Sequence, residues 1–346
     1  MKRQIGFGEQ IQAMVYALLK KLEMALNPLN ILIRCDASVE IGLGHVTRCL
    51  VLAQSFKDKG HQVFFAMKNH ALGINKVTEQ GFKVHIAPTP FNYDHWLLTL
   101  SSQLKVNVFI GDVRDGLPIN TIMQLKAQKI LTVAIDEPSD YRKACDLCFY
   151  PPHAQLDNLD WCGFTGKIKQ GLEYVLLRPE FYQKHKKVKN EKPNILVMMG
   201  GTDPNNLTLT IVRQLLTLVN EIDITVVIPP NHPDYCVIKN SAENVSIKSN
   251  ITNMADFLTH IDFGIIAFGV TAYELLTMQI PALHICLNNN HWQSSEFFKK
   301  NKFAQRIMKS DINNMNAFLH IKPITNNIVS KNMIIDIIQK KVGYGS

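Results

Sequence analysis

The stretch ILIRCDASVEIGLGHVTRC, residues 31–49, decides the fold of this chain. It opens on an apolar, β-branched run at 31–34, which is typical of a buried parallel strand. A loop with Gly42 and Gly44 follows, and apolar residues then recur at helical spacing from His45 to Lys59. A strand that leads through a short glycine-containing loop into a helix predicts a parallel sheet covered by helices.

The same alternation continues along the chain and then starts again. Further strands are expected at Gln62–Met67, Lys83–Ile86, Asn107–Gly111, Leu131–Ile135 and Leu147–Tyr150, with helices at Gly73–Gln80 and Ile119–Gln128. In the second series, strands are expected at Ile195–Met199, Ile224–Ile228, Val245–Lys248, Phe263–Ala267 and Ala282–Cys286, with helices at Asn205–Asn220, Met254–Thr259, Thr271–Met278 and Gln293–Lys300. This predicts an α/β protein with two Rossmann-like, doubly wound domains that face each other across a cleft.

The boundaries follow from the change in composition between the two series. We expect an N-terminal extension at 1–28, a first domain at 29–178, a basic, proline-bounded linker at 179–192 and a second domain at 193–346. Within the extension, Gln10–Leu26 is apolar at helical spacing but has no clean apolar run and no small-residue cleavage site, so a secretory signal is not expected. One alternative for this segment is an amphipathic helix that packs on the domain. Contact with a membrane surface through residues 1–28 is the less favoured alternative.

Composition narrows the classes of function. The chain has 346 residues, 46% of them hydrophobic, and a net charge of +8, which suits a diphosphate-bearing ligand and equally a polyanion. Nucleic acid is not an expected partner, because no Lys and Arg cluster is interleaved with aromatics. Seven cysteines without framework spacing indicate reduced thiols and a cytoplasmic protein. Cys145 and Cys148, with Cys162 and His153 nearby in sequence, are expected to be buried thiols rather than a metal site, and no cofactor is expected.

Ligands of such sheets bind beyond the carboxyl ends of the strands, so the loops that follow strands are the places to look for chemistry. In the first loop, Gly42 and Gly44 allow a tight turn whose amides can hold an anion. His45 follows at the start of the helix. Its imidazole can act as a general base toward water, although a histidine at a helix start with no such role is an open alternative.

The second domain has comparable loops. Gly200 and Gly201 allow backbone contact with a diphosphate or a sugar, and Asp203 is expected beside them among the substrate-binding residues. Asp203 or Thr202 can also cap the next helix, and the two roles can hold together. In the following loop the amides from Gly269 to Thr271 can hold a phosphate.

A carboxylate and three amide side chains complete the expected second-domain site. Glu274 can hold a ribose diol, or can simply be a glutamate favoured by its place early in a helix. Asn289, Asn290 and Gln293 form a polar run after the next strand that can read a base or a phosphate.

Carboxylates also end strands in the first domain. Three of them, Asp112, Asp136 and Glu137, can either contact a bound sugar or cap the chain locally, and the two roles are equally expected. Asp146 begins a strand and is expected to form interior hydrogen bonds.

Three segments carry a resemblance to a known family. The run at 34–53, with the pattern R-x-D-A-x-x-x-I-G-x-G-H-x-x-R-C-x-x-L-A, resembles the signature of the UDP-2,4-diacetamido-2,4,6-trideoxy-β-L-altropyranose hydrolases of pseudaminic acid biosynthesis, which are relatives of spore-coat polysaccharide proteins. The segments MGGTDPNNLT and TAYELLTMQIPAL resemble two further motifs, in the same order. The similarity covers about residues 29 to 310, and the last two motifs are shared with the wider glycosyltransferase-B superfamily.

The resemblance implies a glycosyltransferase-B fold that requires no metal. It implies that His45 activates water to attack the anomeric carbon with inversion, and that the second domain holds UDP through Glu274 and the loop from Gly269 to Thr271. Arg34 and Asp36, at the head of the first motif, are included among the substrate-binding residues.

The sequence also departs from the family pattern. Phe268 and Gly269 stand where the family usually has a glycine pair, and Val113 and Arg114 follow Asp112 where the family has His-Tyr.

The sequence leaves three candidate functions: a hydrolase of a UDP-activated diacetamido-trideoxy sugar in nonulosonic acid biosynthesis, a transferase that uses the same donor, and a non-catalytic nucleotide-sugar binding protein. The oligomeric state is not predicted.

Overall fold

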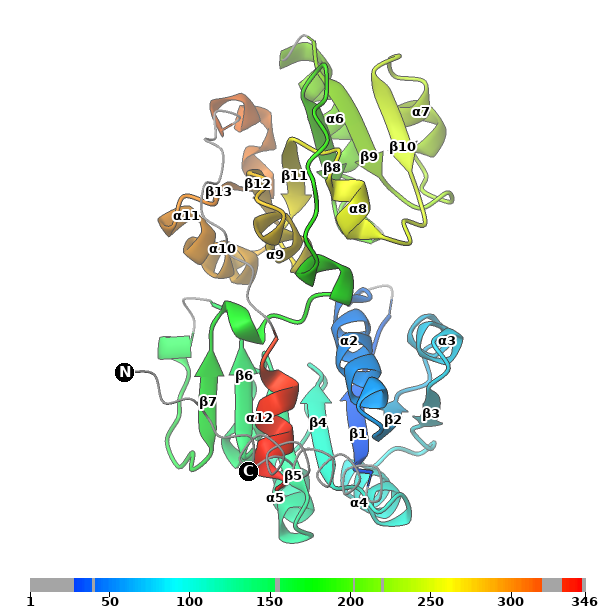
Figure 1. The fold of residues 1–346 in the computed structure, drawn as a ribbon, viewed down its shortest axis with the longest axis vertical. Helices are drawn as coiled ribbons and strands as arrows, with labels where there is room; N and C mark the ends of the chain where they lie inside the picture. The colour runs from blue at the N-terminus through cyan, green and yellow to red at the C-terminus, as the bar shows by residue number, and fades with distance from the viewer. Residues whose placement is uncertain are drawn as a thin grey trace, which may run out of the picture.

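The computed structural model describes residues 28–38, 41–152, 156–201, 203–218, 221–318 and 332–343. The expectations for the N-terminal extension at 1–27, for Thr202 and for His153 lie outside the described residues. The described chain forms two parallel sheets, each within its own layered α/β unit, and Figure 1 shows the two units stacked along the long axis of the molecule.

The first sheet has seven parallel strands. Its strand order is β3 (Lys83–Ile86), β2 (Gln62–Met67), β1 (Asn30–Cys35), β4 (Val108–Asp112), β5 (Leu131–Ile135), β6 (Leu147–Tyr150) and β7 (Lys167–Gln170). The order reverses between β1 and β4, because the chain runs outward from β1 to β3 and then returns to the other side of β1. Such a switch point opens a crevice at the carboxyl ends of the two central strands.

Side-chain alternation along β1 explains why both faces of this sheet are covered. Ile31 and Ile33 point to one face, where α2 (Gly44–Asp58) and α3 (Ala71–Glu79) bury them. Leu32 points to the other face, against α4 (Tyr93–Gln103) and α5 (Ile119–Ala127). A strand buried on both faces is apolar throughout, which is the pattern that predicted it.

The second sheet has six parallel strands. Its strand order is β10 (Val245–Lys248), β9 (Asp223–Val227), β8 (Asn194–Met198), β11 (Phe263–Ala267), β12 (Ala282–Cys286) and β13 (Ala304–Met308). Its faces are covered by α6 (Thr208–Leu218) and α7 (Tyr235–Lys239) on one side and by α8 (Met254–Leu258), α9 (Val270–Thr277) and α11 (Glu296–Lys300) on the other. Here too the order reverses, between β8 and β11. The predicted fold class, two doubly wound α/β domains, is confirmed.

The last described helix, α12 (Ile334–Lys341), returns to the first domain. Ile334 and Ile338 are fully buried in the core beside α2, and Lys59 Nζ lies 2.7 Å from Asp336 Oδ1. Figure 1 shows α12 alongside the first sheet. Residues 193–346 were expected to form the second domain. That boundary is corrected for α12, because the apolar face of this helix packs in the core of the first domain.

Other differences concern elements with little apolar periodicity. The helices α4 and α7 and the strands β7 and β13 were not predicted. The helix expected at Gln293–Lys300 is two shorter helices, α10 (Asn289–Ser294) and α11, which meet at Ser295. Val175 and Leu177, before the expected linker, and Phe181, within it, also pack in the second core.

Candidate active site

The carboxyl ends of β1 and β4 bring together residues that are far apart in the sequence. Cys35 pairs with Asp112 in the parallel register of these strands, so Asp112 lies at the switch point of the sheet. Helix α2 begins at Gly44 directly beyond β1, and its first turn presents His45 and Arg48 to the same place. Gly42 allows the chain to turn from β1 into α2, because its φ of +72° lies in the left-handed region that favours glycine.

His45 and Asp112 form the central contact of this site. The His45 Nδ1 atom lies 2.6 Å from Asp112 Oδ1. Arg48 Nη2 is 3.1 Å from the same nitrogen, but arginine only donates and an ionised carboxylate only accepts, so the nitrogen cannot bond both at once. The shorter contact favours an Nδ1–H that donates to Asp112. That tautomer leaves a lone pair on Nε2 of a side chain that is only partly buried.

Arg48 holds the Asp112 carboxylate from the other side. Its Nε and Nη2 atoms each donate to one Asp112 oxygen at 2.5 Å, a bidentate pair. Burial by itself would raise the pKa of Asp112, but the charge of Arg48 and then the His45 contact hold the pKa of that carboxyl well below its usual range. Asp112 is therefore an ionised acceptor that keeps the imidazole of His45 oriented.

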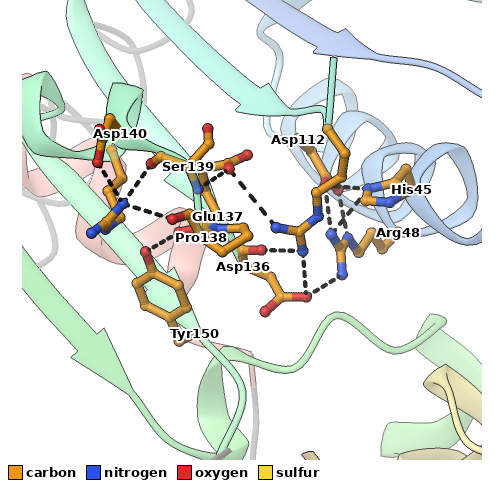
Figure 2. Close-up of polar contacts among 11 residues, drawn as sticks. His45, Arg48, Asp112, Asp136, Glu137, Pro138, Ser139, Asp140 and Tyr150 are labelled. Atoms are coloured by element: carbon orange, nitrogen blue, oxygen red, sulfur yellow. Dashed lines mark hydrogen bonds and ion pairs between the residues drawn. The ribbon is translucent and has the colours of Figure 1, made fainter. Parts of the chain in front are cut away.

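The polar network extends to the end of β5. Arg48 Nη1 donates to Asp136 Oδ2 at 3.0 Å, so Asp136 connects to the His45–Asp112 pair, as Figure 2 shows. Arg114 Nη2 donates to the Asp136 backbone oxygen at 2.5 Å. The Glu137 side chain accepts from the Ser139 amide at 2.6 Å, and burial raises the pKa of Glu137 against the opposing charge of Arg114.

In the second domain, the glycines predicted to contact a ligand border open space. A methyl group added at Gly200, Gly201 or Gly269 would meet no atom within 4 Å. Gly200 and Gly201 follow β8, and Gly269 is the residue that precedes α9, with Thr271 in its first turn. Both loops lie at carboxyl ends of strands beside the switch point of the second sheet. Backbone amides at such a place can hold an anion.

Glu274 lies one turn further along α9 and is buried. Arg178, from the connection between the domains, donates to Glu274 Oε1 at 3.1 Å. Burial raises the pKa of Glu274, while the charge of Arg178 opposes the rise. The pair shows that this carboxylate is held by a chain segment that links the two domains.

Tyr273, the residue before Glu274, reaches the first domain. Its hydroxyl donates to the Pro152 carbonyl oxygen at 3.4 Å. Burial raises the pKa of Tyr273, the charge of Asp136 adds to the rise and the charge of Arg48 opposes it. The hydrogen bond of Tyr273 therefore joins α9 to the segment that follows β6 in the first domain.

The remaining second-domain residues have more local roles in the structure. Asp203 is buried and accepts from the amides of Leu207 and Thr208 at 3.0 and 2.9 Å, which fits the capping role, while its contact with a substrate stays a prediction. Asn289 and Asn290 are exposed in the first turn of α10, and Gln293 is half-buried. Contact of these three residues with a ligand stays a prediction.

Arg34 and Asp36 require a correction. Arg34 is fully buried and donates to Asp36 Oδ2 and Asp115 Oδ2, each at 2.6 Å, and to the Tyr93 hydroxyl at 3.2 Å. Asp36 is also buried and accepts from the Lys68 amide. An arginine enclosed by two carboxylates has its charge matched inside the protein, so this pair joins β1 to the α4 side of the sheet instead of contacting a substrate.

Cys145 and Cys148 were expected to be buried thiols, and Asp146 was expected to form interior hydrogen bonds. Cys145 and Cys148 are buried, and their thiols lie 3.6 and 3.5 Å from the backbone oxygens of Tyr141 and Arg142. Asp146 accepts hydrogen bonds from the amide and the hydroxyl of Thr132. Within the described ranges, no group of three or more His, Cys, Asp and Glu residues is arranged to hold a metal ion.

Sequence reasoning did not assign roles to Arg48, Arg178 and Tyr273. A signal existed for Arg48, because residues three apart on a helix share a face and Arg48 is three residues after His45. Arg178 and Tyr273 act between the domains, and their partners are 96 and 121 residues away.

Comparisons with known proteins complete these observations. No family model matches the chain. The chain is 30% identical over 302 residues to the uncharacterised protein MJ1062 of Methanocaldococcus jannaschii, a match that covers 82% of this chain and 60% of that protein. It is 25% identical to the UDP-2,4-diacetamido-2,4,6-trideoxy-beta-L-altropyranose hydrolase of Campylobacter jejuni, over 79% of this chain and 97% of the relative. It is 20% identical to the spore coat polysaccharide biosynthesis protein SpsG of Bacillus subtilis, over 72% and 74% of the two chains.

Solved structures match over most of the length. The glycotransferase of kitacinnamycin matches with a TM-score of 0.60 and 16% identity, covering 92% of this chain and 96% of that chain. MurG of Acinetobacter baumannii matches with a TM-score of 0.57 and 14% identity, covering 91% and 92%. The chain has the glycosyltransferase-B fold and is a relative of the altropyranose hydrolase. At these identities the structural matches bear on the fold alone.

No helix among the described residues is long and apolar enough to cross a membrane.

Proposed function

We propose that this protein hydrolyses a UDP-activated, diacetamido-trideoxy sugar to UDP and the free sugar. The observation that carries the proposal is the contact of 2.6 Å between His45 Nδ1 and Asp112, which leaves Nε2 of a partly exposed imidazole to accept a proton at the switch point of the first sheet. The relative from Campylobacter jejuni, which is named as such a hydrolase, supports the substrate class.

The reaction begins with water held by His45 Nε2. As the water oxygen attacks the anomeric carbon, Nε2 takes its proton, and the bond from that carbon to the UDP oxygen breaks. Attack from the side opposite to UDP inverts the anomeric configuration. The imidazolium formed on His45 is stabilised by the ionised Asp112, which Arg48 holds in place.

The departing UDP is assigned to the second domain. A Cβ added at Gly200, Gly201 or Gly269 would meet no atom within 4 Å, and in this proposal the backbone amides of these two loops bind the diphosphate. In this proposal Glu274 accepts hydrogen bonds from the ribose hydroxyls, which only its ionised form does with both oxygens. In this assignment the contact of Tyr273 with Pro152 joins α9 to the first domain, and the sugar joined to UDP lies over the first-domain network.

A transferase is the second candidate, since the solved structures with this fold named above include a glycotransferase. The same donor site would then serve a sugar or lipid hydroxyl in place of water. The experiment that separates the two is release of UDP from UDP-2,4-diacetamido-2,4,6-trideoxyhexoses with no acceptor present. Stoichiometric UDP and free sugar support the hydrolase. Turnover only after an acceptor is added supports the transferase, and binding without turnover under either condition supports a non-catalytic protein.

A further inference from the structure

Arg114 belongs to the polar network around His45 and Asp112. It lies two residues beyond the end of β4, and its Nη2 atom donates to the Asp136 backbone oxygen and lies 3.5 Å from the Asp136 carboxylate. Its Nη1 atom is 3.8 Å from Glu137 Oε1. Since Asp136 also binds Arg48, Arg114 is connected through one carboxylate to the His45–Asp112 pair.

Arg114 is the accessible arginine of this network. Its side chain is 36% exposed, against 16% for Arg48. Its described hydrogen bonds all use Nη2, so its Nε–H and Nη1–H donors form none within the part of the chain that the structure describes. Guanidinium donors lie in a rigid planar fork and cannot accept a hydrogen bond, so this edge offers only N–H groups to a ligand.

The charges around Arg114 limit what that ligand group can be. The two guanidinium groups of Arg48 and Arg114 face three carboxyl groups, those of Asp112, Asp136 and Glu137. The network is therefore neutral if Glu137 is protonated and carries a net charge of minus one if it is ionised. A carboxylate on the sugar would meet no surplus positive charge and would be repelled by Asp136. A neutral oxygen that accepts a hydrogen bond meets no such penalty.

We propose that Arg114 is a specificity-determining residue that donates to the carbonyl oxygen of an N-acyl group on the sugar. A hydroxyl at the same carbon is a weaker match, because it also donates and so can turn to Asp136 or Glu137 instead. This inference rests on the proposed function, since it takes the UDP-linked sugar to lie over the first-domain network.

The test compares affinities for two pairs of UDP-sugars, each pair differing by one acetamido group in place of a hydroxyl. The first pair is UDP-N-acetylglucosamine and UDP-glucose. The second is UDP-2,4-diacetamido-2,4,6-trideoxyglucose and UDP-2-acetamido-2,6-dideoxyglucose. UDP alone and UDP-glucuronic acid are measured beside them by titration calorimetry, with the wild type, Arg114→Met and, as the matched control, Arg213→Met at an exposed arginine of α6.

In the wild type and in Arg213→Met, at least one pair is expected to show about 10-fold tighter binding of the acylated sugar, as for a hydrogen bond to a charged donor. Arg114→Met is expected to remove that preference while its affinity for UDP stays unchanged. An acyl preference that survives in Arg114→Met, no preference in the wild type, or tight binding of UDP-glucuronic acid that depends on Arg114 would overturn the proposal. Failure of UDP itself to bind, or of any UDP-sugar to release UDP, would count against the proposed function instead.

Discussion

The Nδ1 atom of His45 lies 2.6 Å from Asp112 Oδ1 although the two residues are 67 positions apart in the chain. The adjacency of β1 and β4 produces this contact, since α2 begins just beyond β1 and Asp112 ends β4. In this pairing the Nδ1 atom is bonded to Asp112, which orients the ring, and the Nε2 atom can act as the base.

Removing the imidazole is expected to stop turnover without weakening UDP binding. His45→Ala should lower kcat by about 100-fold or more, because a general base contributes on that scale. Its affinity for UDP should match the wild type, since UDP is assigned to the second domain. His70→Ala, at an exposed histidine of the same domain, is the control and should retain full activity. Undiminished turnover in His45→Ala would remove this residue from the mechanism.

The orientation of His45 is tested by Asp112→Asn. The asparagine side chain can turn its NH₂ group toward Nδ1, which then accepts a hydrogen bond and moves the ring proton to Nε2, where it blocks the base. A fall in kcat of about 100-fold is expected. The variant should also lose about 3–5 kcal/mol of unfolding free energy, because the partly buried Arg48 loses its main counter-charge. Stability is measured by urea denaturation with Asp58→Asn, at an exposed residue of α2, as the control.

The pH dependence of UDP binding reports on Glu274. Burial raises the pKa of this carboxyl above the ordinary value of about 4.3. If the ionised form binds the ribose, affinity is full above the raised pKa and falls as the pH is lowered through it. We therefore expect UDP affinity to fall from pH 8 to pH 5 more steeply in the wild type than in Glu274→Gln. Because the phosphate of UDP titrates in the same range, only the difference between the two proteins reports on Glu274. Parallel curves would show that this carboxylate does not bind the ribose.

Arg34 provides a contrast between a structural and a ligand-binding arginine. Arg34→Met would leave Asp36 and Asp115 without their shared counter-charge, so a loss of about 3–5 kcal/mol of unfolding free energy is expected. The affinity of the folded variant for UDP should be unchanged. Urea denaturation and calorimetry on the same preparation test both statements. Weaker UDP binding at unchanged stability would restore the substrate-binding role first expected from the motif.

The apolar runs of the central strands made the fold predictable. The strands at Gln62–Met67, Leu131–Ile135 and Phe263–Ala267 have the bounds that their sequences predicted. The edge strands β7 and β13 did not stand out, since KIKQ and AQRIM mix polar and apolar residues as edge strands commonly do. Helix α12 could not be assigned to the first domain, because the sequence of an amphipathic helix does not state which of two cores it completes.

The site was predictable residue by residue but not in its pairings. His45 follows a glycine-containing loop after a strand, and Asp112 ends a strand, so each was found from its own position. Their contact required knowing that β1 and β4 are neighbours. Arg34 was misassigned for the same reason, since its partners Tyr93 and Asp115 lie 59 and 81 residues away and nothing local marks it as enclosed.

The central claim is that water, activated at His45, attacks the anomeric carbon. The most direct test is turnover of a UDP-2,4-diacetamido-2,4,6-trideoxyhexose in ¹⁸O-labelled water without any acceptor, with mass analysis of both products before the free sugar exchanges its anomeric oxygen. The account predicts ¹⁸O in the sugar and none in UDP, with the label absent from both products of His45→Ala because turnover stops. Label in the UDP phosphate, or no turnover until a hydroxyl acceptor is added, would contradict it.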